Sequence, residues 1–337
     1  MFLETVIQLI VSFPAPSRTF DSVTLHLSSL ESTGANHAIF TRKIVAESPN
    51  GIPVVPFATT IRGNVSPHAV EDAEAGLAEG IESGEFLPFS FFRPRDDLTN
   101  PTVAIMDLQD SILSASSLDA FSFLALRNPP SNLNVIAGVV HPQGYPINDL
   151  FGSTLGFDIE MFTNTEFVVQ FADGAFGGDM PTVLTQPAWF SSISYPRGFS
   201  DLKVAPAVGN DCDHQSCLVT VGDIDEEGLE KSLGFSFLAI TGNAPGLIHG
   251  RIQMDASSIL GSIGSGFSVS DDRTSNGTAG GFIIEFDTPF DAIPAVIATP
   301  LAVVEHVNRK KVYIKSGYGG IFYDLHFLVV APPPSSV

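Results

Sequence analysis

The stretch GFIIEFDTPF, residues 281–290, decides the fold class of this chain. Phe282, Ile284 and Phe286 alternate with Ile283, Glu285 and Asp287, so one face is apolar and the other mixed, and this period of two predicts a half-buried antiparallel strand. Thr288-Pro289 ends the strand, because proline has no N–H to donate to a neighbouring strand. The next apolar stretch, residues 295–301, has the pattern of a returning strand.

The same arrangement recurs along the chain. An Ile-x-Gly strand opens at residues 61, 136 and 248, and an aromatic strand ending in Phe-Leu-(Ala/Val) closes at residues 123, 237 and 327. We therefore predict an all-β fold of tandem small antiparallel β-sandwich units, arranged as two pseudo-repeated halves. The first half, 1–135, contains units 1–60 and 61–135. The second half, 136–337, contains units 136–247 and 248–332 and a Pro-rich tail, 333–337.

The composition restricts the partners of the chain. It has 337 residues, of which 44% are hydrophobic and 16% charged, and 16 Lys and Arg against 37 Asp and Glu give a net charge of −21. A chain this acidic repels phosphate backbones, so we expect no nucleic-acid partner. No apolar run approaches the roughly 20 residues of a membrane helix, so we expect no membrane span.

The two cysteines, Cys212 and Cys217, lie in one short polar stretch. Their spacing fits a disulfide at a loop tip, and it also fits a pair of free thiols. With Asp213 and His214 they could hold a metal, but two Cys and one His make an incomplete zinc site. The sequence leaves these three alternatives open, with the disulfide first.

Patterns typical of catalysis are missing from the sequence. None of the eight histidines has the spacing of a metal-binding or catalytic motif, and no serine lies in a nucleophile elbow. His26 and His326 alternate with apolar residues, so we expect both on exposed strand faces. We predict no catalytic residue, no metal site and no cofactor.

The pattern Gly-x-Gly-Phe-x-Val, followed by Phe-x-Ile-x-Phe-x-x-Pro-Phe and Pro-x-Val, resembles small six-stranded domains of phage tail fibres and H-type lectins. The resemblance is clear at 264–301 and 325–331 and less close at 155–187 and 235–240. It rests on residues of the core and therefore implies a fold and not an activity. The sugar-binding positions of the lectin family have no counterparts in this sequence.

The paired layout of 1–135 and 136–337, in an acidic chain rich in Phe and Gly, resembles the diatom pyrenoid shell proteins. Those proteins tile into sheets around Rubisco. The resemblance implies Rubisco as a partner and the chloroplast stroma as the location of this chain. Apart from this resemblance, the sequence does not indicate a compartment.

These observations favour a non-enzymatic structural protein that self-assembles, as a homo-oligomer or lattice, into a sheet, shell, tube or fibre. Soluble β proteins often protect edge strands with lysine, and lysine is scarce here. Two terminal regions are candidate assembly segments: Val6, Ile7 and Leu9 near the N-terminus, and Pro332, Pro333 and Pro334 near the C-terminus. The alternative is a carbohydrate-binding module with glycan ligands, for which Trp189 and Tyr195 are the candidate ligand aromatics.

Overall fold

The computed structural model describes a set of strands and their connections across the chain. The described residues are 24–34, 37–47, 56–61, 89–93, 102–108, 120–125, 132–147, 156–188, 207–221, 234–255, 258–271, 281–300, 302–316 and 324–331. Every element in these ranges is a β-strand, which confirms the all-β fold class. The acidic stretch 68–82, which resembles a short helix in sequence, lies outside them.

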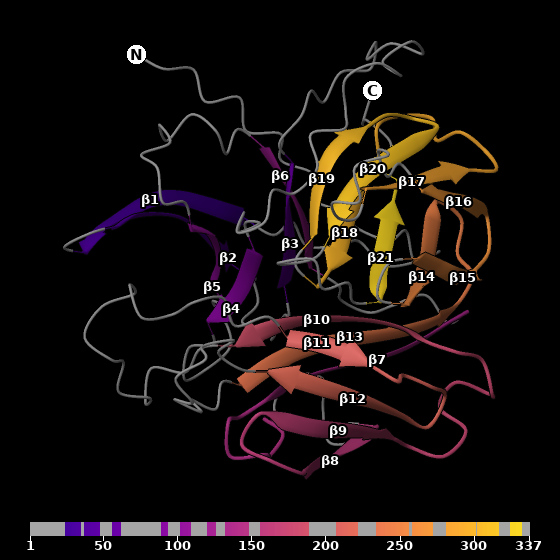
Figure 1. Ribbon diagram of the computed structural model, residues 1–337, viewed down its shortest axis with the longest axis horizontal. Helices are drawn as coiled ribbons and strands as arrows, with labels where there is room; N and C mark the ends of the chain where they lie inside the picture. Colours follow the sequence, from indigo (N-terminus) through magenta and orange to yellow (C-terminus); the bar gives the residue numbers. More distant parts are fainter. Residues whose placement is uncertain are drawn as a thin grey trace.

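The strands form four sheets (Figure 1). The seven-stranded sheet has the order β1 (Thr24–Gly34), β2 (His37–Glu47), β5 (Thr102–Leu108), β4 (Phe89–Arg93), β10 (Thr182–Ala188), β13 (Gly234–Gly242) and β7 (Leu133–Val140). The β8 sheet has the order β11 (Ala207–Asn210), β12 (Ser216–Val221), β9 (Glu166–Phe171) and β8 (Phe157–Met161). The β14 sheet has the order β15 (Ser258–Gly264), β14 (Leu247–Asp255), β21 (Leu325–Val330) and β18 (Ala295–Thr299). The six-stranded sheet has the order β16 (Phe267–Asp271), β17 (Gly281–Phe286), β20 (Lys311–Ser316), β19 (Ala302–Val307), β3 (Pro56–Ile61) and β6 (Ala120–Ala125).

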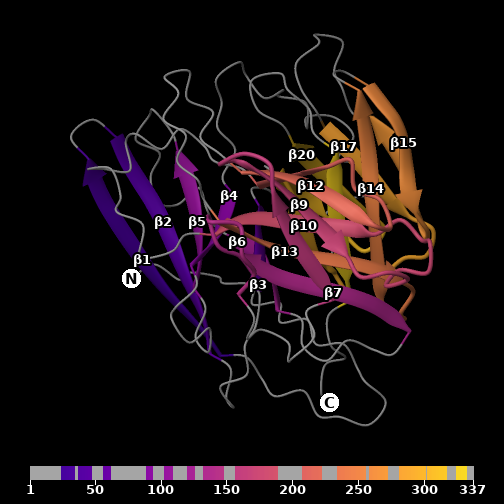
Figure 2. The same cartoon turned by 90° about the horizontal axis from the view of Figure 1, so that it is seen from below.

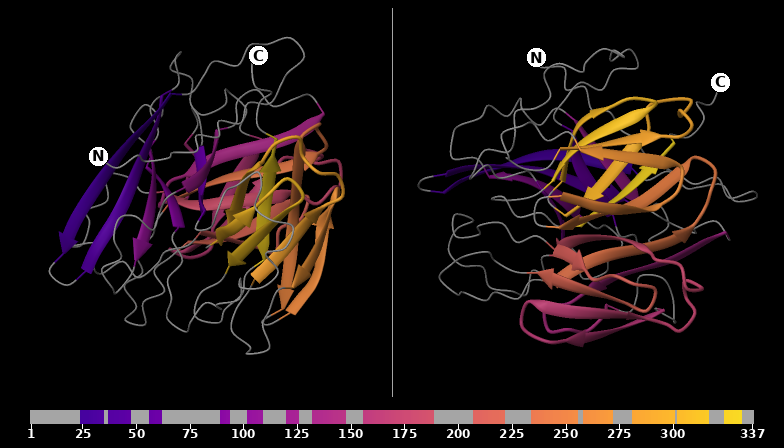
Figure 3. Two further views of the ribbon diagram at one scale, coloured as in Figure 1. Left: turned by 90° about the horizontal axis from the view of Figure 1, so that it is seen from above. Right: turned by 45° about the vertical axis from the view of Figure 1, so that its right-hand side comes forward.

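Three apolar clusters hold these sheets face to face. The first lies between the β8 sheet and strands β7, β10 and β13, and it is rich in phenylalanine, including Phe167 and Phe235. The second lies between the β14 sheet and the six-stranded sheet and includes Phe282 and Phe327. The third, with Leu184 and Leu328, joins the seven-stranded sheet to the β14 sheet. The β8 sheet and the six-stranded sheet are therefore the two outer layers (Figures 1 and 3).

The strands at the centre of this stack are buried on both faces. All residues of β10, β18 and β21 are buried, and so are all residues of β13 except its last. Their sequences agree with this position, because β13 and β21 are nearly continuous apolar runs and do not alternate. The outer strands β9 and β17 do alternate, so that Phe282, Ile284 and Phe286 face the core as the sequence predicts.

Residues 133–242 and 247–330 share one strand order. The order β10-β13-β7 matches β18-β21-β14, and β11-β12-β9-β8 matches β19-β20-β17-β16. In the Ile-x-Gly strands at 136 and 248, the glycine lies under a phenylalanine: a Cβ at Gly138 would be 2.7 Å from Phe157 Cε1, and one at Gly250 would be 2.8 Å from Phe267 Cε1. These phenylalanines meet Phe237 and Phe327 edge to face, each with centroids 4.9 Å apart.

Strands from the first 135 residues extend sheets of the second half. Strand β3 pairs in parallel with β19, and β4 pairs in parallel with β10 at Ala188 and Phe92. Strands β1, β2 and β5 lie on the side of the molecule opposite β14 and β15 (Figure 2). The two halves of the predicted division thus contribute to the same two sheets. The division of the whole chain into four sandwich units stays a prediction.

The returning strand predicted after Pro289 is wrong in its pairing. Strand β18 forms at Ala295–Thr299 but pairs with β21, whereas β17 pairs with β16 and β20. The connection between β17 and β18 therefore crosses from the outer sheet to the β14 sheet. Local alternation identifies a strand but does not identify its neighbour.

Candidate functional site: a buried polar junction between two sheets

Buried polar side chains join the seven-stranded sheet to the β14 sheet. The N–H of Val183 in β10 donates to Nδ1 of His326 at 3.0 Å, and the N–H of Thr185 donates to Oγ1 of Thr299 at 3.1 Å. Side chains from β21 and β18 thereby satisfy backbone donors of β10, a role that an adjacent strand has in a regular sheet. The sequence separations are 143 and 114 residues.

His326 is fully buried in this junction, with 0% of its surface exposed. The prediction of an exposed face is therefore wrong, because a second sheet covers the side of β21 that carries this residue. Burial, with a smaller contribution from the charge of Arg251, lowers the pKa of His326 to about 3. Nδ1 accepts a hydrogen bond from the Val183 N–H, so the proton of the neutral imidazole ring lies on Nε2. Nε2 has no hydrogen-bond partner among the described residues.

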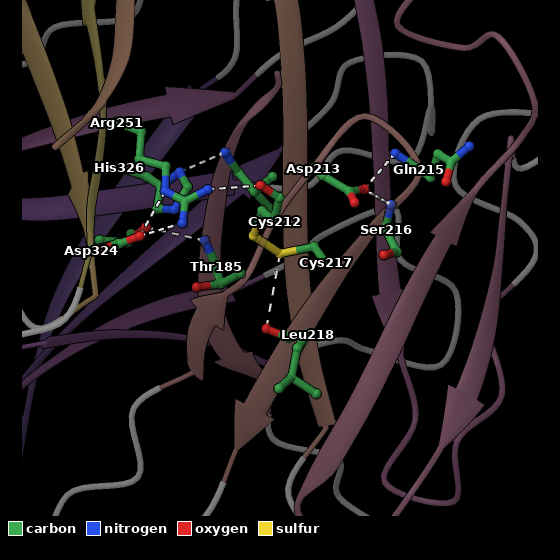
Figure 4. The surroundings of a disulfide bond; sticks show 12 residues. Thr185, Cys212, Asp213, Gln215, Ser216, Cys217, Leu218, Arg251, Asp324 and His326 are labelled. Atoms are coloured by element: carbon green, nitrogen blue, oxygen red, sulfur yellow. Dashed lines mark hydrogen bonds and ion pairs between the residues drawn. A yellow bond between two sulfur atoms is a disulfide. The ribbon is translucent and has the colours of Figure 1, made fainter. Parts of the chain in front are cut away.

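Arg251 and Asp324 form a charged contact beside this junction, between the β14 sheet and the β8 sheet (Figure 4). Arg251 Nε donates to Asp324 Oδ2 at 2.7 Å, Nη2 also contacts this oxygen, and Nη1 donates to the carbonyl of Cys212 at 2.7 Å. Asp324 Oδ1 accepts the N–H of Met254 at 2.8 Å. The guanidinium therefore links β14 and the residue before β21 to the turn between β11 and β12. Such a buried charge is tolerable because its partners satisfy it.

A second histidine lies in a similar arrangement. His249 Nε2 lies 2.8 Å from the carbonyl oxygen of Gly242, and its Nδ1 lies 2.9 Å from Oγ1 of Thr182. Since a carbonyl can only accept, Nε2 carries the proton and Nδ1 accepts from the hydroxyl. Burial lowers the pKa of His249, although the Gly242 carbonyl acts in the opposite direction.

The structure joins Cys212 and Cys217 by a disulfide bond, the first of the three alternatives for this pair (Figure 4). Both sulfurs are buried in the phenylalanine-rich cluster beside Gly209 and Thr185. Asp213 accepts N–H groups of Gln215 and Ser216, each at 2.7 Å. Burial raises the pKa of Asp213, but these N–H groups, together with His214, outweigh burial and lower it overall.

The arrangement of these groups has a structural consequence. Arg251 and His326 are buried, and their described polar contacts are with groups of this protein. Their hydrogen bonds hold the β14 sheet against the seven-stranded sheet through His326 and against the β8 sheet through Arg251. Among the described residues, no three His, Cys, Asp or Glu side chains are grouped so that they could hold a metal ion.

The outer surface has a different character at the β8 edge. Strand β8 pairs with β9 on one side and ends the sheet on the other. At its end, Met161 and Phe162 are exposed, the latter with 62% of its surface. Met161 lies beside Gly144, and the neighbouring Tyr145 is also exposed and stacks on His141 with centroids 4.4 Å apart. An edge strand with exposed apolar side chains at its end is a surface typical of protein contacts.

Most residues singled out from the sequence lie outside the described ranges. These are Val6, Ile7, Leu9, Trp189, Tyr195, Pro332, Pro333 and Pro334. Sequence reasoning did not identify Arg251 and Asp324. A usable signal was present: Arg251 is a charge inside the long strand Leu247–Asp255 of a chain with few basic residues.

Comparisons with protein-family models, curated proteins and solved structures find no match for this chain. In the part of the chain that the structure describes, no helix is long and apolar enough to cross a membrane. Neither resemblance noted from the sequence is tested by these findings.

Proposed function

We propose that this chain is a non-enzymatic structural protein that self-assembles through its β-sheets into a sheet, shell, tube or fibre. The observation that carries the proposal is the division of roles between interior and surface. The buried polar side chains, Arg251, His326 and Thr299 among them, bind the sheets to one another. The apolar side chains of Met161 and Phe162 are left at a sheet edge.

A building block of a lattice needs a fixed shape and surfaces that bind sister molecules. The stacked sheets provide the fixed shape, because each central strand is packed on both faces. The β8 edge supports a surface for sister molecules, since it can accept another strand or bury its apolar end against a neighbour. A shell around Rubisco is the form that the pyrenoid resemblance implies, and the choice of Rubisco rests on that resemblance alone.

Light scattering on the purified full chain tests the proposal. We expect a mass above that of the 35.8 kDa monomer which rises with protein concentration. Replacing Phe162 with Asp should reduce that mass at equal concentration, because a charge would enter the apolar contact. The matched control is Leu260→Asp, at an exposed apolar residue of β15, an edge strand of the β14 sheet. A monomer at every concentration would refute self-assembly.

A further inference from the structure

The turn between β19 and β20 concentrates positive charge in an acidic chain. Four of the 16 Lys and Arg residues lie within seven positions: Arg309, Lys310, Lys311 and Lys315. Lys315 pairs with Glu305 at 3.6 Å, and Lys311 lies 5.1 Å from the ring centroid of Tyr313. Arg309 and Lys310 are exposed at the tip of the turn.

The backbone of this turn is fixed. Asn308 Oδ1 accepts the N–H of Lys310 at 2.7 Å and that of Lys311 at 2.9 Å, and the N–H of Asn308 donates to the Lys311 carbonyl at 2.9 Å. Arg309 Nε donates to the Phe290 carbonyl at 2.7 Å. The two exposed cations are thus presented from an ordered position, which lowers the entropy lost on binding.

The β8 sheet has the opposite charge. Its strands and their connections, residues 156–181 and 207–221, contain no Lys or Arg and seven acidic residues. These are Asp158, Glu160, Glu166, Asp173, Asp179, Asp211 and Asp213. Asp158 and Glu160 are exposed on β8, next to the apolar end of that strand.

The corresponding turns of residues 133–242 and 247–330 show the same contrast in charge. Asp213 between β11 and β12 accepts N–H groups of the residues two and three positions later, as Asn308 does between β19 and β20. The N–H of Asp213 donates to the Ser216 carbonyl at 2.8 Å, which repeats the contact of Asn308 with Lys311. One backbone arrangement therefore carries acidic residues in the β11–β12 turn and basic residues in the β19–β20 turn, whose neighbouring segment also exposes Glu285, Asp287 and Asp291.

We propose that the basic β19–β20 turn of one copy docks on the acidic outer face of the β8 sheet of a second copy. This inference deepens the proposed function and rests on it. The two surfaces belong to different outer sheets, so each copy can donate a turn and accept one at the same time (Figure 1). A contact of this kind is head-to-tail, and it generates rings or open-ended arrays and not closed pairs. Two acidic faces repel each other, which opposes face-to-face pairing of two β8 sheets.

Charge reversal of each surface, followed by mixing, tests the docking. The turn variant is Arg309→Glu/Lys310→Glu, and the face variant is Asp158→Lys/Glu160→Lys. Alone, each variant juxtaposes like charges and should raise the concentration at which assemblies form by about tenfold or more. An equimolar mixture should restore assembly, because the turn of each variant complements the face of the other.

A second comparison separates the effect of charge at the β19–β20 turn from the effect of the net charge of the chain. Arg309→Gln/Lys310→Gln and Ser262→Glu/Ser265→Glu both make the chain more negative by two charges, but only the first changes the turn. We expect the first variant to weaken assembly and the second, at exposed residues, to leave it unchanged.

Each result is decisive. Wild-type protein that never assembles overturns the proposed function and this inference together. Wild-type assembly that both charge-reversal variants retain overturns the docking and leaves the proposed function standing. Loss in both variants without recovery on mixing also overturns the docking, because complementary surfaces would then not be the cause.

Discussion

Acidification should destabilise this protein through His326. In the unfolded chain the imidazole has its ordinary pKa of 6.5, whereas in the folded protein the pKa is about 3. The unfolded state therefore binds a proton first as the pH falls, and stability present above about pH 6.5 is lost progressively toward pH 3. Between pH 7 and pH 5 this linkage amounts to about 2 kcal/mol of unfolding free energy from His326 alone.

The structure supplies a variant that isolates this contribution. In His326→Asn the amide oxygen can accept the Val183 N–H in place of Nδ1, and the side chain does not titrate. We expect the variant to be less stable at pH 7, because the smaller side chain leaves a void, but to depend less on pH between 7 and 5. His249, whose pKa is also lowered, should retain a smaller slope of the same sign in the variant.

Urea titrations followed by circular dichroism at pH 7, 6 and 5 measure this difference at protein concentrations below assembly. The comparison of interest is the slope of unfolding free energy against pH. Equal slopes for wild type and His326→Asn would refute the assignment of a buried, neutral histidine at the junction.

Three further predictions concern packing, charge and the cysteines. Gly138→Ala should lower the free energy of unfolding by roughly 1–3 kcal/mol, because the new Cβ would overlap Phe157. The control Gly261→Ala should change thermal unfolding little, because the nearest atom to its new Cβ would be Gln253 Oε1 at 3.9 Å. Arg251→Met should lower the free energy of unfolding by about 3 kcal/mol or more, because Asp324 would lose its buried partner, and Arg251→Met/Asp324→Leu should recover part of this loss. A double variant as unstable as the single one would contradict the ion-pair argument. Denatured protein should show no free thiol before reduction and two afterwards, and Cys212→Ser/Cys217→Ser should lose about 2 kcal/mol of loop-closure stabilisation; thiols that react without reductant would show that the disulfide does not form.

The sequence was informative about strands and their inward faces. Alternation in residues 281–286 correctly identified Phe282, Ile284 and Phe286 as core residues, because neighbouring side chains of a strand point to opposite sides. It could not show that β18 pairs with β21, since period carries no information on the partner.

The polar junction depended on contacts that no local pattern encodes. His326 alternates with Leu325 and Phe327, which places it on the other face of β21 but does not show that this face is covered. The run Phe327 to Val330 contained the missing signal, because an uninterrupted apolar strand is typical of burial on both sides. Arg251 and Asp324 lie 73 residues apart, so only the tertiary fold brings them together.

Negative-stain electron microscopy of the pure full chain, across a range of concentrations, tests self-assembly most directly. We predict repeating arrays, such as sheets, tubes or fibres, in which the unit is one copy of the chain. Separate particles of monomer size in every field, at concentrations where light scattering also shows a monomer, would contradict the structural role proposed for this protein.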